Sequence, residues 1–226
     1  MIGVLTGLRA EARCLRRLDL TIACSGARPQ RARSEAARLL AEGVVGLVSF
    51  GLAAGLAREL RPGDLILADT VSLPDGRALA SDAVWRDRLQ AGLVKAGIAA
   101  QIGAVAGSER LLATPEQKQA LLAATGALAA DMESHAVAEA ASAAGKPFLV
   151  IRAISDPADQ ALPAAAVRFL GAEGRIRPTA LTGIIGNPRE LARLLGLGLQ
   201  TRRALATLHR VAVAAGGSLD RPFTRP

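Results

Sequence analysis

DMESHA at residues 131–136 and VIRAISD at residues 150–156 are the two stretches that decide the fold of this chain. VIRAISD belongs to an apolar run that begins at Pro147 and predicts a buried strand, and the alanine-rich residues after DMESHA predict a helix. Carboxylates therefore stand at or near strand ends in both stretches. Because a buried carboxylate without a partner is costly, and because open α/β folds bind their ligands at this edge of the sheet, we expect a ligand site there.

Apolar runs alternate with helical patterns along the rest of the chain. We expect strands at 2–5, 20–24, 44–50, 65–69, 102–106, 128–132 and 147–154, and helices at about 9–17, 30–42, 81–96, 115–124 and 134–144. This alternation predicts a mainly parallel sheet with helices on both faces. A glycine-containing turn is expected at 51–55, and residues 157–187 are expected to be irregular. Residues 188–215 predict one or two terminal helices, with a break at Gly196 and Gly198.

The composition fits one globular α/β domain with a basic end. Half of the 226 residues are hydrophobic, which is ample for a large core. The formal net charge is +8, and from Ala166 onward ten arginines stand against three acidic residues, so the basic character belongs to the C-terminal quarter. Aromatic residues make up 2% of the chain and tyrosine is absent, which removes the stacking platforms for nucleic-acid bases. We therefore expect no specific nucleic-acid partner.

Metal binding and membrane insertion find little support in the sequence. Two cysteines without a C-x-x-C pair, together with two histidines, predict neither a disulfide framework nor a metal site. Arg9, Glu11 and Arg13 interrupt the apolar N-terminus before a signal peptide is formed, and no window has the length and hydropathy of a membrane span. We expect a cytoplasmic protein, in one reading peripheral to the inner face of the membrane.

Single motifs carry little weight alone. A glycine turn after a strand, as at Gly51, more often serves packing than phosphate binding, and Glu11 in a first helical turn is by itself a solvated helix end. Asp156 alone fits a helix cap. His135 is better explained as a helix residue whose ring nitrogens have hydrogen-bond partners than as a catalytic residue. Only their combination points to one chemistry.

Together, four segments resemble the purine nucleoside phosphorylase and nucleosidase superfamily. They are GLRAEA at 7–12, SFGLAAGL at 49–56, DMESHAVA at 131–138 and VIRAISDPAD at 150–159, and they occur in the family's order. LRPGD at 60–64 also fits. The resemblance implies a single-domain, three-layer α/β/α fold with a twisted mixed sheet, in which residues 1–160 form the core and residues 161–226 form a basic helical extension packed on the same domain. It also implies cleavage of the N-glycosidic bond of a nucleoside.

Roles follow for individual residues from the same resemblance. Asp156 would be the general acid that protonates the purine at N7, so burial has to favour its protonated form. Glu133 would accept the ribose hydroxyls, and Met132 would pack on the sugar. Arg152 would hold carboxylates in place near the nucleophile, and Glu11 would activate water. Further substrate-binding candidates are Asp131, Ser155, Gly51, Leu52 and Ala53.

Departures from the nucleosidase branch for 5′-methylthioadenosine and S-adenosylhomocysteine narrow the resemblance. Leu52 stands where those enzymes usually have serine, Asp131 replaces the usual glutamate, and Pro157 follows the aspartate. The segment 72–86 is short and lacks their aromatic-rich loop. These features and the basic tail resemble the hopanoid-associated phosphorylases, which are thought to remove adenine from the lipid nucleoside adenosylhopane.

Several alternatives stay open. The nucleophile is phosphate, with Arg28 as a candidate anion ligand, or water, and no other cofactor is expected. The substrate is adenosylhopane or, alternatively, methylthioadenosine or S-adenosylhomocysteine. A second alternative is an inactive homologue that binds a membrane or nucleic acid. The family implies a homo-oligomer. From 191 to 212, leucines and alanines recur at helical spacing while arginines lie elsewhere, which fits a docked helix or contact with an anionic membrane.

Overall fold

The structure is a computed structural model that describes residues 1–171 and 187–219, and within them eight strands form one sheet. The strands are β1 (Ile2–Thr6), β2 (Thr21–Cys24), β3 (Gly46–Gly55), β4 (Leu65–Ser72), β5 (Ala78–Ala80), β6 (Gln101–Gly107), β7 (Ala129–Asp131) and β8 (Phe148–Asp156). The helices are α1 (Arg9–Leu15), α2 (Pro29–Ala41), α3 (Ala83–Lys95), α4 (Pro115–Thr125), α5 (Ser134–Ala143), α6 (Ala164–Gly171) and α7 (Pro188–Leu219).

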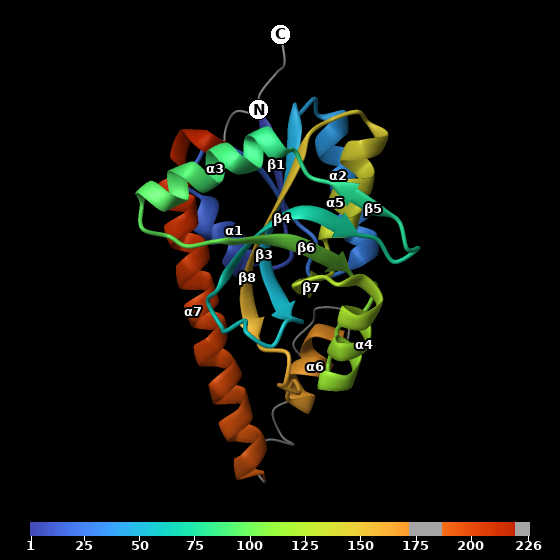
Figure 1. Ribbon diagram of the computed structural model, residues 1–226, viewed down its shortest axis with the longest axis vertical. Helices are drawn as coiled ribbons and strands as arrows, with labels where there is room; N and C mark the ends of the chain where they lie inside the picture. Colours follow the sequence, from blue (N-terminus) through green and yellow to red (C-terminus); the bar gives the residue numbers. More distant parts are fainter. Residues whose placement is uncertain (172–186, 220–226) are drawn as a thin grey trace.

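The sheet is mixed, as the resemblance implied. Strand β3 pairs in parallel with β1 and β8 and antiparallel with β7, whereas β4 pairs in parallel with β6 and antiparallel with β5 and β8. Helices α2 and α5 lie side by side on one face, and α1, α3 and α7 cover the other (Figure 1). The three-layer α/β/α architecture is therefore confirmed, and the sheet contains more antiparallel pairs than the alternation of elements predicted.

The end of strand β3 differs from the prediction, and this difference affects the site. We expected a turn at 51–55, but β3 continues to Gly55, because Gly51, Leu52 and Ala53 pair in parallel register with residues 152–154 of β8. A register shift after Ala53 brings Ala54 opposite Asp156. The glycine-rich segment is thus a bulged strand end that lies directly beside the end of β8.

The C-terminal half of the chain also differs from the prediction. Residues 164–171 form α6 within the stretch expected to be irregular. Residues 157–163 contain no helix or strand, in agreement with the prediction, and residues 172–186 lie outside the described residues. Helix α7 runs unbroken through Gly196 and Gly198, and its backbone departs from helical geometry only at Gly216. The boundary that we placed after residue 160 stays a prediction.

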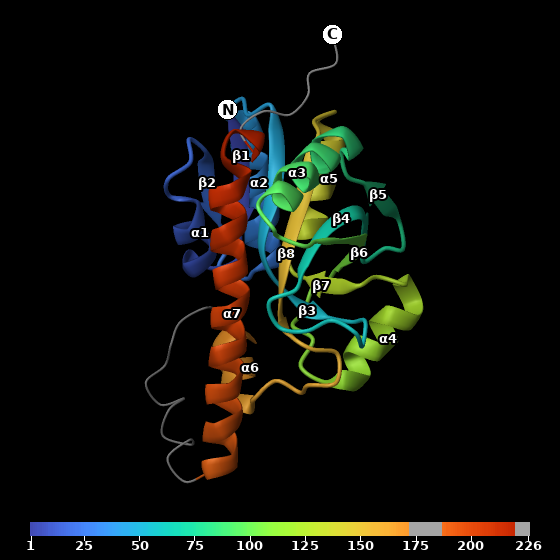
Figure 2. The same ribbon diagram turned by 60° about the vertical axis from the view of Figure 1, so that its left-hand side comes forward.

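Helix α7 has two different halves. Its second half packs on β8, α1 and α3 through buried side chains, among them Ala204, Leu208 and Val211, which confirms a docked helix there. Its first half extends beyond the sheet (Figure 2), and Leu191, Leu195 and Leu199 are exposed on it. Neither α7 nor any other helix in the described ranges has the length and hydropathy that crossing a bilayer requires.

The docking of α7 predicts a sharp contrast between two leucines of the same helix. Leu208 is fully buried, so Leu208→Ala should lower the free energy of unfolding by about 2–5 kcal/mol. Leu199 is 60% exposed, and Leu199→Ala should change it by less than about 0.5 kcal/mol. Urea unfolding of both variants measures this, and equal effects would contradict the docking described here.

Candidate functional site

A cavity of about 590 Å³ opens at the edge where β3, β7 and β8 end. Most of the predicted site residues line it: Glu11, Leu52, Ala53, Asp131, Met132, Glu133, Ser155 and Asp156. These predicted residues therefore lie together around one cavity, at the edge of the sheet where we expected a ligand site. These residues come from four parts of the chain, which the pairing of β3 with β7 and β8 and the position of the first turn of α1 bring together.

Three predicted site residues do not line the cavity. Arg152 is fully buried beneath its floor, and Gly51 lies between Arg152 and Glu11. Arg28 is exposed at the N-cap of α2, so the structure does not bring this candidate phosphate ligand to the cavity.

A buried ion pair forms the floor. The Arg152 guanidinium donates to Asp131 Oδ2 through Nε, and through Nη2 to the hydroxyls of Ser49 and Ser134. Asp131 Oδ1 accepts the backbone N–H groups of Glu133 (2.8 Å) and Ser134 (2.7 Å). Asp131 thus holds the start of α5, as an acidic group at a helix N-terminus does, and fixes the backbone from which Glu133 reaches the cavity.

Glu133 is 5% exposed and accepts a hydrogen bond from Ser25 Oγ at 2.9 Å. Burial raises the pKa of Glu133 to about 7, and the neighbouring charges of Asp131 and Glu11 act in the same direction, while Arg152 and Ser25 oppose them. A Cβ at position 7 would lie 3.0 Å from Glu133 Oε1, so Gly7 leaves room for this carboxylate.

Glu11 is held by two backbone N–H groups, that of Leu8 at 2.7 Å and that of Leu52 at 2.9 Å. Burial raises its pKa, although these hydrogen bonds and the charge of Arg152 oppose the change. A Cβ at Gly51 would lie 2.7 Å from Arg152 Nη1 and 2.8 Å from the Glu11 carboxyl, so only glycine permits this approach. Arg152 Nη1 itself has no hydrogen-bond partner among the described residues, which leaves a buried donor beside Glu11 for a bound oxygen atom.

Asp156 has protein partners on both oxygens. Ser155 Oγ donates to Oδ1 at 2.6 Å, and Lys118 Nζ lies 2.5 Å from Oδ2. Our sequence analysis missed Lys118. Its helix, α4, has no clear apolar face, so no periodic signal marks position 118 as buried.

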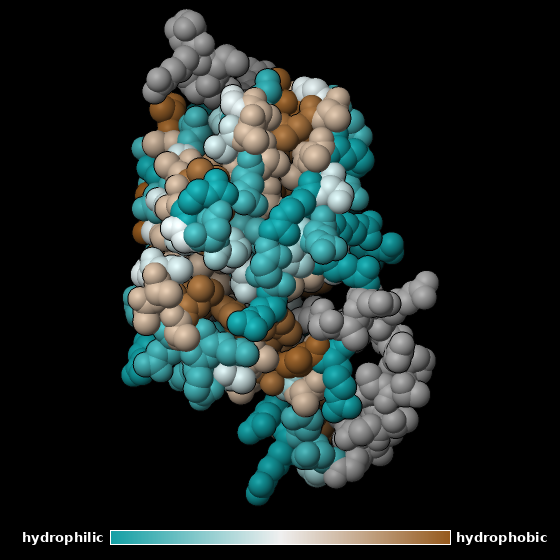
Figure 3. All heavy atoms as spheres, turned by 90° about the vertical axis from the view of Figure 1, so that its right-hand side faces the viewer, coloured by the Kyte–Doolittle hydropathy of each residue, from teal (hydrophilic) through white to brown (hydrophobic). Residues whose placement is uncertain are grey.

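The second half of the cavity is apolar, and sequence reasoning missed it as well. Leu111 and Leu112 come from the segment after β6, Leu162 and Ala165 from the region of α6, and Leu194 and Leu197 from the first half of α7, and they line this part. Figure 3 shows apolar surface in a hollow on the lower part of one face, with hydrophilic residues around it. The cavity therefore joins a carboxylate-rich end to an apolar end.

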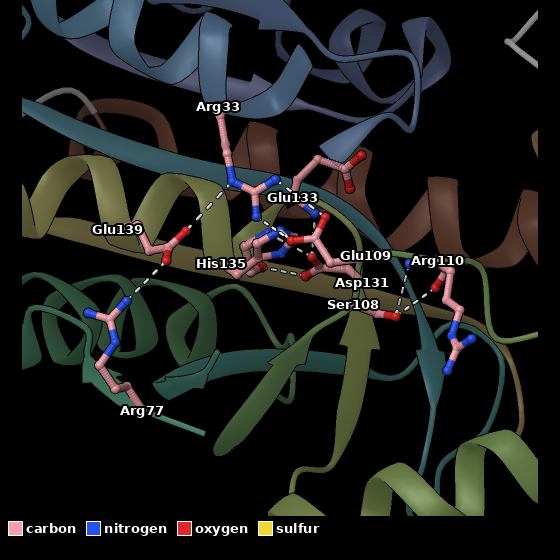
Figure 4. A network of polar contacts seen from close by, with 10 residues as sticks. Arg33, Arg77, Ser108, Glu109, Arg110, Asp131, Glu133, His135 and Glu139 are labelled. Atoms are coloured by element: carbon pink, nitrogen blue, oxygen red, sulfur yellow. Dashed lines mark hydrogen bonds and ion pairs between the residues drawn. The ribbon is translucent and has the colours of Figure 1, made fainter. Parts of the chain in front are cut away.

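His135 does not line the cavity and is fully buried in α5, where burial lowers its pKa. Its Nε2 lies 3.3 Å from Glu109 Oε1, although neither ring nitrogen has a hydrogen bond of regular geometry. Figure 4 shows Glu109 between His135 and Arg33, and Arg33 also reaches Glu139. This network ties α2 and α5 to the segment after β6.

The described residues contain no group of three or more His, Cys, Asp or Glu side chains that could hold a metal ion.

Comparisons with known proteins agree with this fold. The family model described as the phosphorylase superfamily matches residues 13–182. No curated protein matches the sequence. The solved 5′-methylthioadenosine/S-adenosylhomocysteine nucleosidase of Neisseria meningitidis, in complex with methylthio-immucillin-A, has a TM-score of 0.73 and 18% identity over 94% of this chain and 96% of that one.

Two Helicobacter pylori structures have the same fold. The 5′-methylthioadenosine/S-adenosylhomocysteine nucleosidase has a TM-score of 0.72 and 18% identity, with 97% of each chain covered. Futalosine hydrolase has a TM-score of 0.68 and 18% identity, over 93% of this chain and 96% of that one. At this level of identity, the likeness concerns the fold.

The raised pKa of Glu133 predicts a pH-dependent stability. Since ionisation is shifted from 4.5 to about 7 by folding, the stabilising contribution is fully present below pH 4.5 and is lost as the pH rises through 7. Glu133→Gln cannot ionise, so it should match the wild type near pH 4.5 and exceed its free energy of unfolding by up to about 3 kcal/mol at pH 8. The exposed Glu59→Gln is the matched control. Denaturant unfolding at both pH values measures the difference, and a constant difference would contradict the assigned cause.

Proposed function

The chain belongs to the phosphorylase superfamily and is an enzyme of the nucleoside phosphorylase and nucleosidase type, and we propose that it releases adenine from an adenosine whose 5′ carbon carries a large apolar group. The substrate that we favour is adenosylhopane. The observation that carries this proposal is the division of one cavity into a carboxylate-rich end and an apolar end.

The carboxylate-rich end suits the nucleoside. In our proposal Asp156 gives a proton to the purine at N7, which turns the base into a neutral leaving group. Glu133 accepts the ribose hydroxyls in charge-assisted hydrogen bonds and stabilises the oxocarbenium-like sugar, as a buried carboxylate can. Met132, which lines the same end, packs on the sugar.

The apolar end suits the 5′ substituent. Five leucines form the apolar wall of the cavity, which is much larger than a methylthio group needs: Leu111, Leu112, Leu162, Leu194 and Leu197. Apolar surface removed from water contributes about 25 cal/mol per Å², so an extended hydrocarbon would gain more from this wall than a small group. This supports a lipid nucleoside over methylthioadenosine, whose nucleosidases share the fold.

Water is the nucleophile that we favour. Glu11, Asp131 and Glu133 bring three carboxylates to one end of the cavity, and the Arg152 guanidinium beneath it is already paired with Asp131. A phosphate dianion would meet repulsion there, and Arg28 does not line the cavity. Glu11 beside the unpaired Arg152 Nη1 offers an acceptor and a donor for one water molecule.

Adenine release from a series of substrates tests the proposal. Adenosine, 5′-methylthioadenosine and adenosines with a long 5′-alkyl chain are compared, each with and without phosphate. We expect kcat/KM to rise with chain length and release to continue without phosphate. Asp156→Asn should reduce turnover by about 10²–10⁴-fold on every substrate. Preference for 5′-methylthioadenosine would support the alternative nucleosidase, and no release from any substrate would support the inactive homologue.

A variant of Glu11 tests the choice of nucleophile. Glu11→Gln keeps the shape of the side chain and one acceptor oxygen, so it retains one of the hydrogen bonds from the N–H groups of Leu8 and Leu52, but it cannot take a proton from water. Its kcat in phosphate-free buffer should fall by about 10²-fold or more, with little change in KM. A strict phosphate requirement of the wild type, with a ribose-1-phosphate-type product, would refute hydrolysis and leave the glycosidic cleavage standing.

The first half of α7 also carries a proposal about where the substrate comes from. Leu191, Leu195 and Leu199 are exposed, and the exposed Arg189 and Arg193 lie on the same two turns as the cavity-lining leucines. A basic helix with an apolar stripe suits an anionic bilayer surface, where each basic residue contributes about 1 kcal/mol. We infer that this half of α7 rests on such a surface beside the mouth of the cavity.

Two double variants separate the functions of this helix. Leu194→Ser with Leu197→Ser alters the cavity wall and should lower kcat/KM for the long-chain substrate at least about tenfold in detergent, with little effect on adenosine. Leu195→Ser with Leu199→Ser alters the exposed face and should reduce co-sedimentation with anionic liposomes and cleavage of liposome-borne substrate only. Binding that is unchanged, or a shift from oligomer to monomer in sedimentation, would assign the exposed face to a second copy of the chain instead.

A further inference from the structure

Lys118 is the buried residue of α4. It is fully buried, whereas Glu116, Gln117 and Gln119 around it are exposed. A lysine ammonium out of water is unfavourable unless hydrogen bonds and an opposite charge compensate it. An apolar residue would serve packing at this position without that cost, so the lysine calls for a chemical explanation.

The ammonium of Lys118 has one acceptor for each of its three N–H bonds. Nζ lies 2.5 Å from Asp156 Oδ2, 2.7 Å from the carbonyl of Pro157 and 3.0 Å from the carbonyl of Gln160. An ammonium offers three donors and no acceptor, so this set saturates it and fixes its orientation. Lys118 therefore joins α4 to the end of β8 at the residue to which we assign proton donation.

Each oxygen of the Asp156 carboxyl accepts one hydrogen bond. Ser155 Oγ donates to Oδ1 and Lys118 to Oδ2. Such a group holds no spare proton of its own, although the proposed reaction needs one at the purine. The proton nearest to Asp156 is on Lys118 Nζ. Asp156 lines the cavity and Lys118 does not, so a proton from Lys118 can reach a substrate only through Asp156.

We propose that Lys118 and Asp156 act as one proton-donating pair, in which the proton rests on Lys118 and passes through the Asp156 carboxyl to the purine. This deepens the proposed function and rests on it. Lys118 Nζ first gives its proton to the Asp156 carboxylate, and Asp156 gives that proton to N7 as the electron pair of the glycosidic bond goes to N9. Adenine leaves neutral, Asp156 is again a carboxylate, and Lys118 is a neutral amine. Water adds to the sugar cation and loses a proton to Glu11, and that proton returns to Lys118 through solvent. Lys118 is thus a positioning and proton-supplying residue that acts through Asp156.

In the described part of the chain, the other charged side chains near the pair do not bind Lys118 or Asp156. Glu11, Asp131 and Glu133 line the same cavity, with partners of their own. Arg110 lines the rim. Glu116 on α4 and Asp159 after β8 are exposed, and among the described residues none of these groups forms a hydrogen bond or ion pair with Lys118 or Asp156. The alkaline limb of activity therefore reports mainly on the pair.

The pH profile of kcat/KM for the wild type, Lys118→Met and Lys118→Arg tests the proposal, with the 5′-alkyladenosine or 5′-methylthioadenosine that the wild type cleaves. A pair that holds its proton on an amine keeps the proton to higher pH than a lone carboxylic acid. The alkaline limb should therefore move to lower pH in Lys118→Met, with kcat at pH 8 reduced about tenfold or more and KM little changed, and Lys118→Arg should restore the wild-type limb in part. A limb that stays in place or moves to higher pH in Lys118→Met would overturn the proposal and leave Lys118 as an anchor of the Asp156 carboxylate.

A second measurement is independent of activity and of any Lys118 variant. The chain has only three lysines, and Lys95 and Lys146 are exposed. ¹³Cε-lysine NMR therefore gives three signals, and Lys95→Arg and Lys146→Arg assign Lys118 by elimination. The Lys118 signal should show deprotonation at lower pH in Asp156→Asn than in the wild type, because the ammonium loses its counter-charge. Identical titrations would overturn the pair. Absence of adenine release by the wild type, with the NMR result as expected, would refute the proposed function alone.

Discussion

The ion pair between Arg152 and Asp131 is the interaction on which the site depends. Both side chains are buried, and the pair joins β8 to the start of α5 and, through Ser49, to β3. Removal of one partner from such a pair leaves a buried charge and costs about 3–5 kcal/mol. Through Asp131, the same pair fixes the backbone of Glu133, and it places Arg152 Nη1 beside Glu11. The positions of the Glu11 and Glu133 carboxyl groups therefore depend on this pair.

Four buried carboxyl groups at one sheet edge would repel one another if all were equivalent, and their surroundings make them different. Asp131 has a guanidinium and Asp156 an ammonium as direct partners. Glu11 and Glu133 have mainly N–H or O–H donors, and burial raises the pKa of both. Two of the four groups are therefore paired with cations, while burial favours the protonated form of the other two. Groups whose surroundings differ in this way are typical of sites that carry out acid–base chemistry.

Sequence patterns predicted the parts of the fold that local residues determine. The apolar run before Asp156 is β8, and the alanine-rich stretch from Ser134 is α5, because burial on both faces and helical spacing leave direct signals. The segment 51–55 resembles a turn through its glycines, and only pairing with β8 makes it a strand. Glycine at position 51 is required by Glu11 and Arg152, residues far away in sequence, and no local pattern contains that requirement.

Lys118 and the apolar wall escaped prediction for a related reason. A lysine beside one glutamate and two glutamines is typical of a solvated helix, and only the tertiary position of α4 buries it. The wall combines leucines from three segments, each of which alone resembles ordinary core or surface. The combination of sequence motifs thus pointed to the carboxylates, while the groups that contact and surround them became visible only through packing.

Gly196 and Gly198 lie in the part of α7 that borders the apolar end of the cavity. We expected them to break the helix, yet they lie within it, although each lowers helix stability by roughly 1 kcal/mol relative to alanine. Their backbone angles are not left-handed, and a Cβ at either position would meet no atom within 4 Å. Neither the backbone nor the packing of the described residues requires glycine there. Both flank Leu197, which lines the apolar end of the cavity. Under our proposal, the missing side chains at these two positions leave room beside Leu197 for the apolar tail of the substrate where it enters the cavity.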